Sequence, residues 1–326
     1  MNAVRFFSLV LVGALLLAGV AVVLPMIEDD TVTVAFSDKS NYETLIIAKE
    51  TGMLEDAGIR PLLVTGGIRA AEALVTGSAD MAAMGDGPAV STIAKDNGAM
   101  IVARFINGEG MHRFIAHTDI SEPKELEGNK VGLQQGSSSH GAFLRWMDAN
   151  GVDPDKVTIV PMDPKNIPLA MQIGVSGPDR DGIVAMAGSE PWAIATEREC
   201  GSAVYEIGNS SGQGTTFPMV LVASQRIMDR NPAAVSDMIG ILVKSNQFII
   251  DNWSEAMEIC ASRTGAVNVT EQESCSLLQN YEVGFDESDL QSLEMAAQVM
   301  LEFGRISALP DISSHIDKRF LNGLDA

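Results

Sequence analysis

The chain alternates short runs of β-forming residues with helical stretches from residue 31 onward. Residues 31–36 and 59–64 are rich in aliphatic and β-branched side chains, which predicts two strands, and a helical stretch follows each of them. Gly66-Gly67 marks the turn into the second of these helices. Strands that alternate with helices pair in parallel, so the sequence predicts an α/β fold with mostly parallel sheets covered on both faces.

A second, similar series begins near residue 116. Further strands are predicted at residues 79–84, 100–106, 130–134, 157–160, 183–186, 204–207 and 219–223, and the chain after them is largely helical. The length of 326 residues also exceeds the usual size of one hydrophobic core. We therefore expect two domains of this α/β type.

The N-terminus carries an uncharged and almost entirely apolar run, residues 6–27, with Arg5 before it and Glu28-Asp29-Asp30 after it. A run of this length can cross a membrane as a helix. It is either an uncleaved anchor or a signal peptide cleaved near Gly19-Val20-Ala21, and a buried helix is a third alternative. Both of the first two alternatives place the rest of the chain outside the cytoplasm.

Acidic residues outnumber basic ones, with 43 Asp and Glu against 22 Lys and Arg and a net charge of -21. Because the sequence contains no run of Lys or Arg, it excludes a nucleic-acid partner. The strong charge favours a soluble monomer. Three cysteines are too few for a disulfide-based scaffold. Cys260 and Cys275 could pair outside the cytoplasm, or all three cysteines could be isolated thiols.

The common catalytic and metal-binding motifs are missing from the sequence. It has no phosphate-binding loop, no H-E-x-x-H, no C-x-x-C and no G-x-S-x-G. The four histidines, including His140 at a predicted helix start, do not have the spacing of metal ligands. We therefore expect neither an enzyme nor a cofactor or metal site, and we interpret His140 as a capping or hydrogen-bonding residue.

At four places a strand runs into a turn of small residues and then into a helix. These turns are Thr65-Gly66-Gly67, Gly85-Asp86-Gly87, Gly136-Ser137-Ser138-Ser139 and Gly188-Ser189-Glu190. In an open α/β sheet such turns gather at the carboxyl edge of the strands, where ligands bind. Each helix start offers unpaired N–H groups and a partial positive charge. Several helix starts aimed at one point predict an anion site without Lys or Arg.

Each turn also has a simpler interpretation, because Gly and Ser are ordinary connector and capping residues. Ser137, Ser138 and Ser139 can cap the helix that follows and still donate hydrogen bonds to a ligand. Asp86 either caps its own helix or meets a cationic group of the ligand. Glu190 could bind a ligand amine, form a hydrogen bond at a hinge or interact with a helix dipole, and the sequence leaves these alternatives open.

The order of several motifs resembles a known protein family. Leu74-x-x-Gly77-x-Ala79-Asp80 is followed by Gly85-Asp86-Gly87-Pro88, and Lys124-Glu125-Leu126-Glu127-Gly128-Asn129-Lys130-Val131-Gly132 is followed by Gly136-Ser137-Ser138-Ser139-His140. In this order and spacing the motifs resemble the sulfonate, taurine and nitrate solute-binding proteins of ABC importers. The resemblance covers residues 31–321.

The resemblance implies the type II periplasmic-binding-protein fold, in which two doubly wound parallel-sheet α/β lobes are joined by two hinge strands. A hydrophobic helix in residues 1–30 would precede them. Residues 31–115 and 216–326 would form the first lobe and residues 116–215 the second, with crossings near Ala116-His117 and Thr215-Thr216. The residues that the resemblance implies at the cleft are Ser37, Asn41, Gly66, Gly67, Asp86, Gly87, Ser137, Ser138, Ser139 and Glu190.

The resemblance also implies an extracytoplasmic protein that binds a small anionic solute and delivers it to an ABC permease and its ATPase. An organosulfonate such as taurine is the first choice of solute, and nitrate or bicarbonate comes next. The chain would be secreted or tethered through residues 6–27, since Val20 stands where many relatives carry a lipid-anchor Cys, and Val175–Arg180 is an insertion relative to the family. The alternatives are a ligand-sensing domain and an enzyme on the same scaffold, similar to menaquinone-pathway lyases or a thiamine-pyrimidine synthase.

Overall fold

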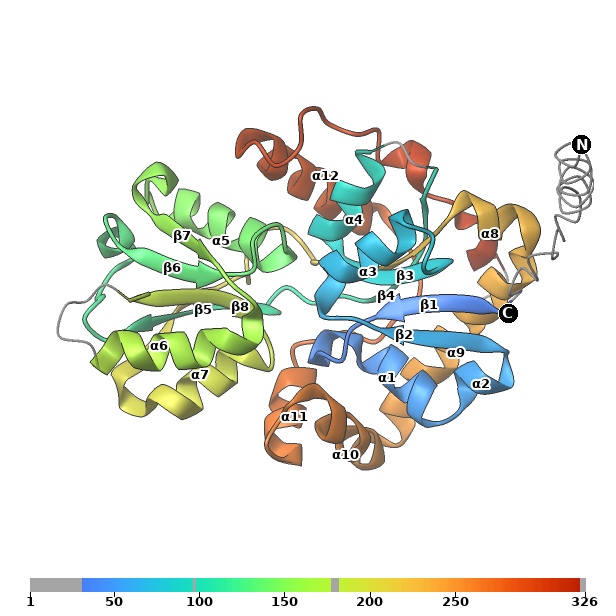
Figure 1. Ribbon diagram of the computed structural model, residues 1–326, viewed down its shortest axis with the longest axis horizontal. Helices are drawn as coiled ribbons and strands as arrows, with labels where there is room; N and C mark the ends of the chain where they lie inside the picture. Colours follow the sequence, from blue (N-terminus) through green and yellow to red (C-terminus); the bar gives the residue numbers. More distant parts are fainter. Residues whose placement is uncertain (1–30, 96–97, 177–181, 323–326) are drawn as a thin grey trace, which may run out of the picture. The chain divides into compact units, whose positions relative to one another are not determined.

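The computed structural model describes residues 31–95, 98–176 and 182–322. The predicted hydrophobic helix in residues 6–27 and most of the Val175–Arg180 insertion lie outside these residues. From Val32 onward the described chain forms one unit, which contains two separate sheets (Figure 1).

The first sheet has five strands in the order β2-β1-β3-β10-β4. Their bounds are β2 (Ile59–Leu63), β1 (Val32–Phe36), β3 (Met81–Gly85), β10 (Met219–Ala223) and β4 (Met100–Ile106). β1 pairs in parallel with β2 and β3, whereas β10 is antiparallel to β3 and β4. All five strands lie where the sequence predicts them, within two residues at each end.

The second sheet repeats this arrangement in the order β7-β6-β8-β5-β9. Its strands are β7 (Thr158–Pro161), β6 (Lys130–Leu133), β8 (Ala185–Ser189), β5 (His112–His117) and β9 (Val204–Asn209). β6 is parallel to β7 and β8, and β5 is antiparallel to β8 and β9. In each sheet the antiparallel strand is the one that arrives from the other sheet. The predicted pair of α/β lobes is therefore confirmed, with one reversed strand in each.

Helices cover both faces of each sheet (Figure 1). On the first sheet, α3 (Gly66–Val75), α4 (Asp86–Ile93) and α12 (Glu287–Glu302) lie on one face, and α1 (Glu43–Glu50), α2 (Met53–Asp56) and α9 (Pro232–Asp251) lie on the other. On the second sheet, α5 (Ser138–Ala149) lies opposite α6 (Ile167–Ser176) and α7 (Trp192–Cys200). The remaining α-helices are α8 (Gln225–Arg230), α10 (Trp253–Thr264) and α11 (Val269–Ser276).

Alternate side chains of each strand pack into different cores. In β5, Phe114 faces α5, where its ring centroid lies 5.3 Å from that of Phe143 and 5.2 Å from that of Trp146. The next residue, Ile115, belongs to the core that includes Ile167 of α6. This two-residue period explains why central strands such as β3 and β10 contain only apolar residues and glycine: both of their faces are buried.

The chain crosses between the sheets twice, from β4 to β5 and from β9 to β10. Thr215-Thr216 lies in the second crossing, as expected. The predicted first crossing is wrong, because Ala116-His117 forms the end of β5 inside the second sheet. The chain instead leaves the first sheet in residues 107–111, so the boundary predicted between residues 115 and 116 falls within a strand of the second lobe.

Glycine is the signal that marks this first crossing. Gly108 donates its N–H to the carbonyl of Thr216 at 2.7 Å, which ties the two crossings together. A Cβ on Gly108 would lie 2.1 Å from the carbonyl oxygen of Leu278, so a larger residue would clash with the backbone. The predicted boundary came from the family resemblance, and the sequence patterns predicted no strand at residues 112–117, where β5 lies.

One described helix has the length and composition of a membrane-spanning segment. α9 is the one described helix that is long and apolar enough to cross a membrane, with a mean hydropathy of 1.2, but half of it is buried in the protein. Its Asn246 donates to the carbonyl of Phe105 at 2.7 Å, which fixes α9 on β4 as a core helix.

The three cysteines do not form a disulfide. Cys200, Cys260 and Cys275 are all free thiols, so of the two alternatives the structure has isolated thiols.

Candidate functional site

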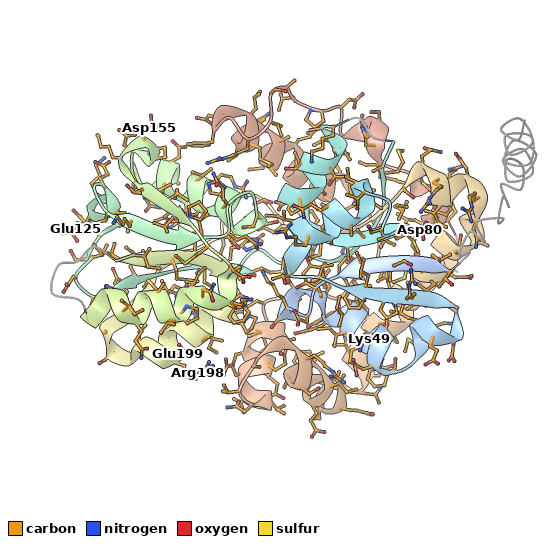
Figure 2. All side chains as sticks on the ribbon, in the orientation of Figure 1. Lys49, Asp80, Glu125, Asp155, Arg198 and Glu199 are labelled. Atoms are coloured by element: carbon orange, nitrogen blue, oxygen red, sulfur yellow. The ribbon has the colours of Figure 1, made fainter. Side chains whose placement is uncertain are left out.

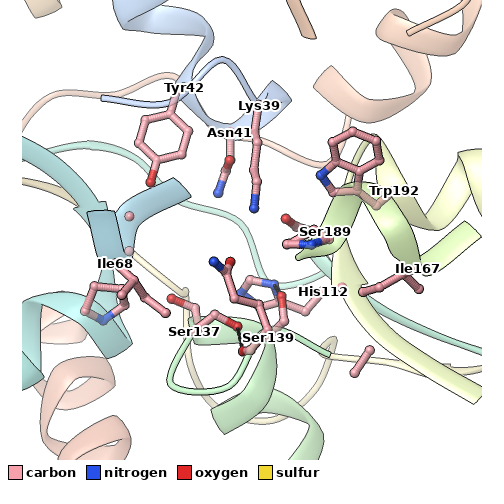
Figure 3. A pocket seen from close by; sticks show the side chains of 18 residues that line it. Lys39, Asn41, Tyr42, Ile68, His112, Ser137, Ser139, Ile167, Ser189 and Trp192 are labelled. Carbon is pink, nitrogen blue, oxygen red and sulfur yellow. Dashed lines mark hydrogen bonds between the residues drawn. The ribbon is translucent and has the colours of Figure 1, made fainter. Parts of the chain in front are cut away.

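The main cleft lies between the carboxyl ends of the two sheets, and loops from both lobes line it (Figure 3). It encloses about 520 Å³ of space, including its open mouth. From the first lobe it is lined by Lys39, Asn41, Tyr42, Gly67, Ile68, Gly85 and Pro88. From the second lobe it is lined by His112, Gln134, Ser137, Ser138, Ser139, Pro164, Ile167, Ala187, Gly188, Ser189 and Trp192. Residues from all four of the predicted strand-to-helix turns therefore line this one cleft.

The charge of the lining is its most informative property. Among the described residues that line the cleft, Lys39 is the one with a charged side chain, and none is a carboxylate. This contrasts with a chain that carries 43 acidic residues. Asp80, Glu125, Asp155 and Glu199 lie on the outer parts of the lobes (Figure 2). The local charge of the cleft is thus opposite in sign to that of the whole protein.

Lys39 lies on the loop between β1 and α1, and its Nζ points into the cleft (Figure 3). Within the described part of the chain, this Nζ has no ion-pair or hydrogen-bond partner. Burial lowers the pKa of Lys39 to about 8, and the charges of Asp163 and Asp38 partly oppose that shift. The side chain is therefore mostly protonated at neutral pH. This corrects the expectation of an anion site built without Lys or Arg.

Neutral polar groups surround the Lys39 ammonium. Trp192, at the start of α7, has a buried Nε1–H with no hydrogen-bond partner among the described residues. The Oδ1 of Asn41 and the Nε2 of His112 are likewise buried and unpartnered there. An unpaired buried polar group costs roughly 1–3 kcal/mol, which a ligand that pairs with it recovers. These atoms therefore favour a polar ligand in the cleft.

His112 is held in place by the start of α5. Its Nδ1 lies 3.0 Å from the Oγ of Ser139, and its ring meets the ring of Phe217 edge-on at 4.7 Å. Burial lowers the pKa of His112 to about 3, and the positive charges of Arg145 and Lys39 add to this shift. The imidazole is therefore neutral at neutral pH and acts as a hydrogen-bonding group.

The three serines of the β6–α5 loop all line the cleft, as the sequence predicts. Ser137 is the N-cap of α5: its Oγ accepts from the N–H of His140 at 3.3 Å and donates to the carbonyl of Gln134 at 2.7 Å. The Oγ of Ser138 accepts from the N–H of Gly87 at 3.4 Å. With Ser139 paired to His112, each hydroxyl already has a protein partner. The N–H groups of Ser138 and Ser139, at the first two positions of α5, have no partner within the helix and remain for a ligand.

Ser37 and Gly66 form the wall behind Lys39. The Oγ of Ser37 accepts from the N–H of Gly66 at 3.1 Å, which fixes the start of α3. Gly66 has a φ of 80°, a conformation that favours glycine. A Cβ there would lie 3.5 Å from the Nζ of Lys39. Of the predicted first-lobe residues, Asn41 and Gly67 line the cleft itself, and Ser37 and Gly66 support it.

Asp86 and Gly87 are not part of the cleft lining but lie where the two lobes touch. The Oδ1 of Asp86 accepts from the N–H of Gly87 at 2.7 Å within the first turn of α4, whereas the N-cap position itself is Gly85 and has no side-chain cap. Burial raises the pKa of Asp86, and the charge of Arg145 opposes this shift. A Cβ on Gly87 would lie 3.2 Å from the backbone C of Ser137 and the backbone N of Ser138. Glycine at this position therefore permits the lobes to meet.

Glu190 lies outside the main cleft, so the expectation that it faces the cleft is corrected. Its Oε1 accepts from Nη1 of Arg113 at 2.8 Å, and its Oε2 accepts from the N–H of Ile194 at 3.0 Å. The carboxylate thus joins β5, which carries Arg113, to the first turn of α7. This agrees with the helix-start alternative, because all of these groups belong to the second lobe, and not with a ligand amine.

Sequence comparisons show which known proteins this chain is similar to. A sequence model of the NMT1-like family matches residues 26–262, which is more than half of the chain. The chain belongs to the NMT1-like family. BAB2_1146 of Brucella abortus (strain 2308), whose name marks it as a candidate binding protein, is 28% identical over 225 residues, or 66% of this chain. This NMT1-like chain spans about 65% of the length of the curated relatives it matches.

Solved structures share the fold of this NMT1-like chain. The alkanesulfonate-binding protein SsuA of Xanthomonas axonopodis pv. citri, bound to MOPS, has a TM-score of 0.77 at 18% identity, over 88% of this chain and 98% of SsuA. SsuA of Escherichia coli has a TM-score of 0.75 at 18% identity, over 88% and 92%. A mutant of the desulfurization enzyme DszB with biphenyl-2-sulfinic acid has a TM-score of 0.66 at 14% identity, over 90% and 98%. The resemblance found in the sequence and the expected fold are confirmed.

Proposed function

We propose that this protein binds a small organic anion between its two lobes, outside the cytoplasm, and performs no chemistry on it. The observation that carries the proposal is the cleft, whose charged lining side chain is Lys39 and whose described lining contains no carboxylate. Inside a closed cleft a single ammonium attracts an anion more strongly than it would in water, because the local dielectric constant is lower. A cation would find no carboxylate among the described residues that line the cleft.

The lining also favours a ligand with a carbon skeleton. Ile68, Pro88 and Ile167 give the cleft apolar walls, and the ring of Trp192 adds an aromatic one. Nitrate, sulfate and bicarbonate have no apolar part to place against them. An organosulfonate therefore ranks first. Taurine fits less well than an uncharged-tail sulfonate, because its ammonium group would meet Lys39 without a carboxylate to pair with.

Binding is proposed to proceed by closure of the lobes. The start of α5 contacts the β3–α4 turn, where Gly87 permits close approach. Closure excludes water from Lys39 and adds the second lobe's donors to the ligand. A ligand can favour the closed state only if it binds that state better than the open one, and groups from both lobes meet this requirement.

The partners follow from the same proposal. An ABC permease and its ATPase would accept the solute, and residues 6–27 would export the chain or hold it at the membrane. One structure with this fold, with a TM-score of 0.72 at 12% identity, is a ligand-binding component of an ABC-type import system from Staphylococcus aureus. The likeness supports this partnership without identifying the permease.

A thermal-shift panel tests the proposed function. Alkanesulfonates and arylsulfonates should raise the melting temperature by several degrees at saturation, through mass action on the folded state. Taurine, nitrate, sulfate and bicarbonate should have smaller effects, and the uncharged sulfonamides should have none. Stabilisation by an organic cation, with no response to any anion, would contradict the proposal.

An enzyme is the second function that a specific observation supports. The desulfurization enzyme DszB shares the fold, and the Oγ of Ser139 lies 3.0 Å from Nδ1 of His112 inside the cleft. This pair resembles a nucleophile and its base. The low pKa of His112, about 3, makes it a weak base at neutral pH. Mass spectrometry of the sulfonates that bind, after long incubation with the protein, should find them unchanged; conversion to product would favour the enzyme.

A further inference from the structure

A second cavity lies behind the start of α5, on the other side of Ser137 and Ser138 from the main cleft. It is formed by α5 of the second lobe and by α4, α12 and the segment after α12 of the first. Its polar lining includes His140 and Arg145 from the second lobe and Asp86 and Arg305 from the first. Unlike the main cleft, it is narrow, with room for about one water-sized group.

Arg145 is the unusual side chain of this cavity. Its Nε donates to the Oε1 of Gln213 at 3.1 Å, and its guanidinium lies over the ring of Phe217 at 4.9 Å from the centroid. Its Nη1 and Nη2 are buried and have no hydrogen-bond partner among the described residues. Four N–H donors of one charged group are therefore left unpaired. The charge of Asp86 favours the protonated guanidinium, but its carboxylate accepts from none of these N–H groups, and a buried guanidinium normally donates hydrogen bonds to an anion.

His140 adds a second unpartnered donor. Its Nδ1 accepts from the N–H of Gly136 at 3.2 Å, so in the neutral ring the proton is on Nε2. That Nε2 is buried and without a partner in the described structure, and the residue as a whole is 2% exposed. Burial lowers the pKa of His140 to about 4, and the charge of Arg305 adds to this shift, so the ring is neutral at neutral pH.

The charges that line the cavity are two arginines and one aspartate. Asp86 forms no ion pair with Arg145 in the described residues, and its carboxylate accepts from the N–H of Gly87 instead. The charged side chains of the cavity lining therefore sum to one positive charge, and its unpartnered polar groups are N–H donors. One monovalent anion would neutralise this excess.

We propose that this cavity is a second anion site, which binds a small monovalent inorganic anion such as chloride through the Nη groups of Arg145 and the Nε2 of His140. Arg305 of the first lobe supplies the remaining charge. Because its ligands come from both lobes, the bound ion joins them at a place that the solute in the main cleft does not reach. The inference is independent of the proposed function, since it needs no organic solute.

Bromide locates the ion directly, because it replaces chloride and scatters X-rays anomalously. Crystals grown in sodium bromide should show an anomalous peak within hydrogen-bond distance of the Nη groups of Arg145. Arg145→Met should remove that peak and leave any other bromide sites unchanged. A water molecule in the cavity, with bromide bound only elsewhere on the surface, would overturn the proposal.

A solution experiment covers the case in which Arg145→Met fails to fold. At constant sodium concentration, replacing gluconate by chloride should raise the melting temperature by several degrees, because gluconate is too large for the cavity. Arg305→Gln, at an exposed position, should reduce this rise at least by half. The matched control is Arg69→Gln, which lies on the surface in α3 and should keep the full rise. Equal melting temperatures of the natural chain in chloride and gluconate would contradict the second site.

Discussion

The two lobes contribute different chemistry to the same cleft. The first lobe supplies its charge, through Lys39 on the loop after β1. The second lobe supplies neutral groups, through the serines at the start of α5, His112 on β5 and Trp192 on α7. The difference shows that the two lobes determine different properties of the bound ligand, namely the sign of its charge and its orientation in the cleft. The ammonium determines that the ligand is an anion, and the neutral donors fix how it lies.

Removal of the first lobe's charge should have the largest effect. Lys39→Met should weaken the binding of an organosulfonate about a hundredfold, which corresponds to the upper part of the roughly 1.5–3 kcal/mol that a hydrogen bond to a charged group contributes. Calorimetric titration measures this change. Lys244→Met is the matched control, because Lys244 is an exposed lysine on α9 of the same lobe. Similar losses in both variants would show that the overall charge, rather than the cleft, controls affinity.

Raising the pH should reproduce this loss in the unmodified protein. The pKa of Lys39 is about 8 without ligand, so the anion-binding form is lost as pH rises above that value. Affinity should fall by up to about tenfold per pH unit there, to the level of Lys39→Met. Stability without ligand should rise slightly over the same range, because the unfolded chain then binds more protons than the folded one. An affinity that is flat from pH 7 to about 10 would contradict the role of Lys39.

A smaller effect should follow from a change at the contact between the lobes. Gly87→Val would push the backbone of Ser137 away and oppose closure, so affinity should fall about tenfold, which corresponds to about 1.4 kcal/mol. Small-angle scattering should show that saturating ligand compacts the natural chain more than the variant. Gly240→Ala on α9 is the control, because a Cβ there meets nothing within 4 Å. Unchanged affinity and compaction in Gly87→Val would argue against closure at this contact.

Loss of one neutral donor should have the smallest effect. Trp192→Phe keeps the aromatic wall but removes the unpartnered Nε1–H, so affinity should fall about fivefold, or about 1 kcal/mol. The same titration measures it, and Trp253→Phe, on α10 away from the cleft, should have no effect. A loss for Trp192→Phe as large as that for Lys39→Met would remove the distinction between the lobes.

The fold could be predicted from the sequence because its signals are local. Residues 219–223 predict a strand through composition alone, and β10 has those bounds. The turns of the cleft could be predicted because parallel strands carry their carboxyl ends to one edge. The reversed direction of β5 and β10 was not predictable in this way, since it depends on how the crossings connect the two sheets.

The site was only partly predictable, because side-chain direction depends on distant partners. Glu190 turns from the cleft toward Arg113, which is 77 residues away in sequence. Lys39 was missed because a search for clustered basic residues ignores a single lysine. Its position two residues before Asn41, on a loop already assigned to the cleft, was the available signal. In a buried site one positive charge is enough to attract an anion, so a count of basic residues underestimates the electrostatic potential of the cleft.

The central claim, that Lys39 gives the cleft its preference for anions, is tested most directly by calorimetric titration with an alkanesulfonate and its uncharged sulfonamide. Both ligands are measured against the natural chain, Lys39→Met and Lys244→Met. The account predicts that the natural chain and Lys244→Met bind the sulfonate about a hundredfold more tightly than the sulfonamide, and that Lys39→Met binds the two nearly equally. An undiminished preference for the sulfonate in Lys39→Met would contradict the account.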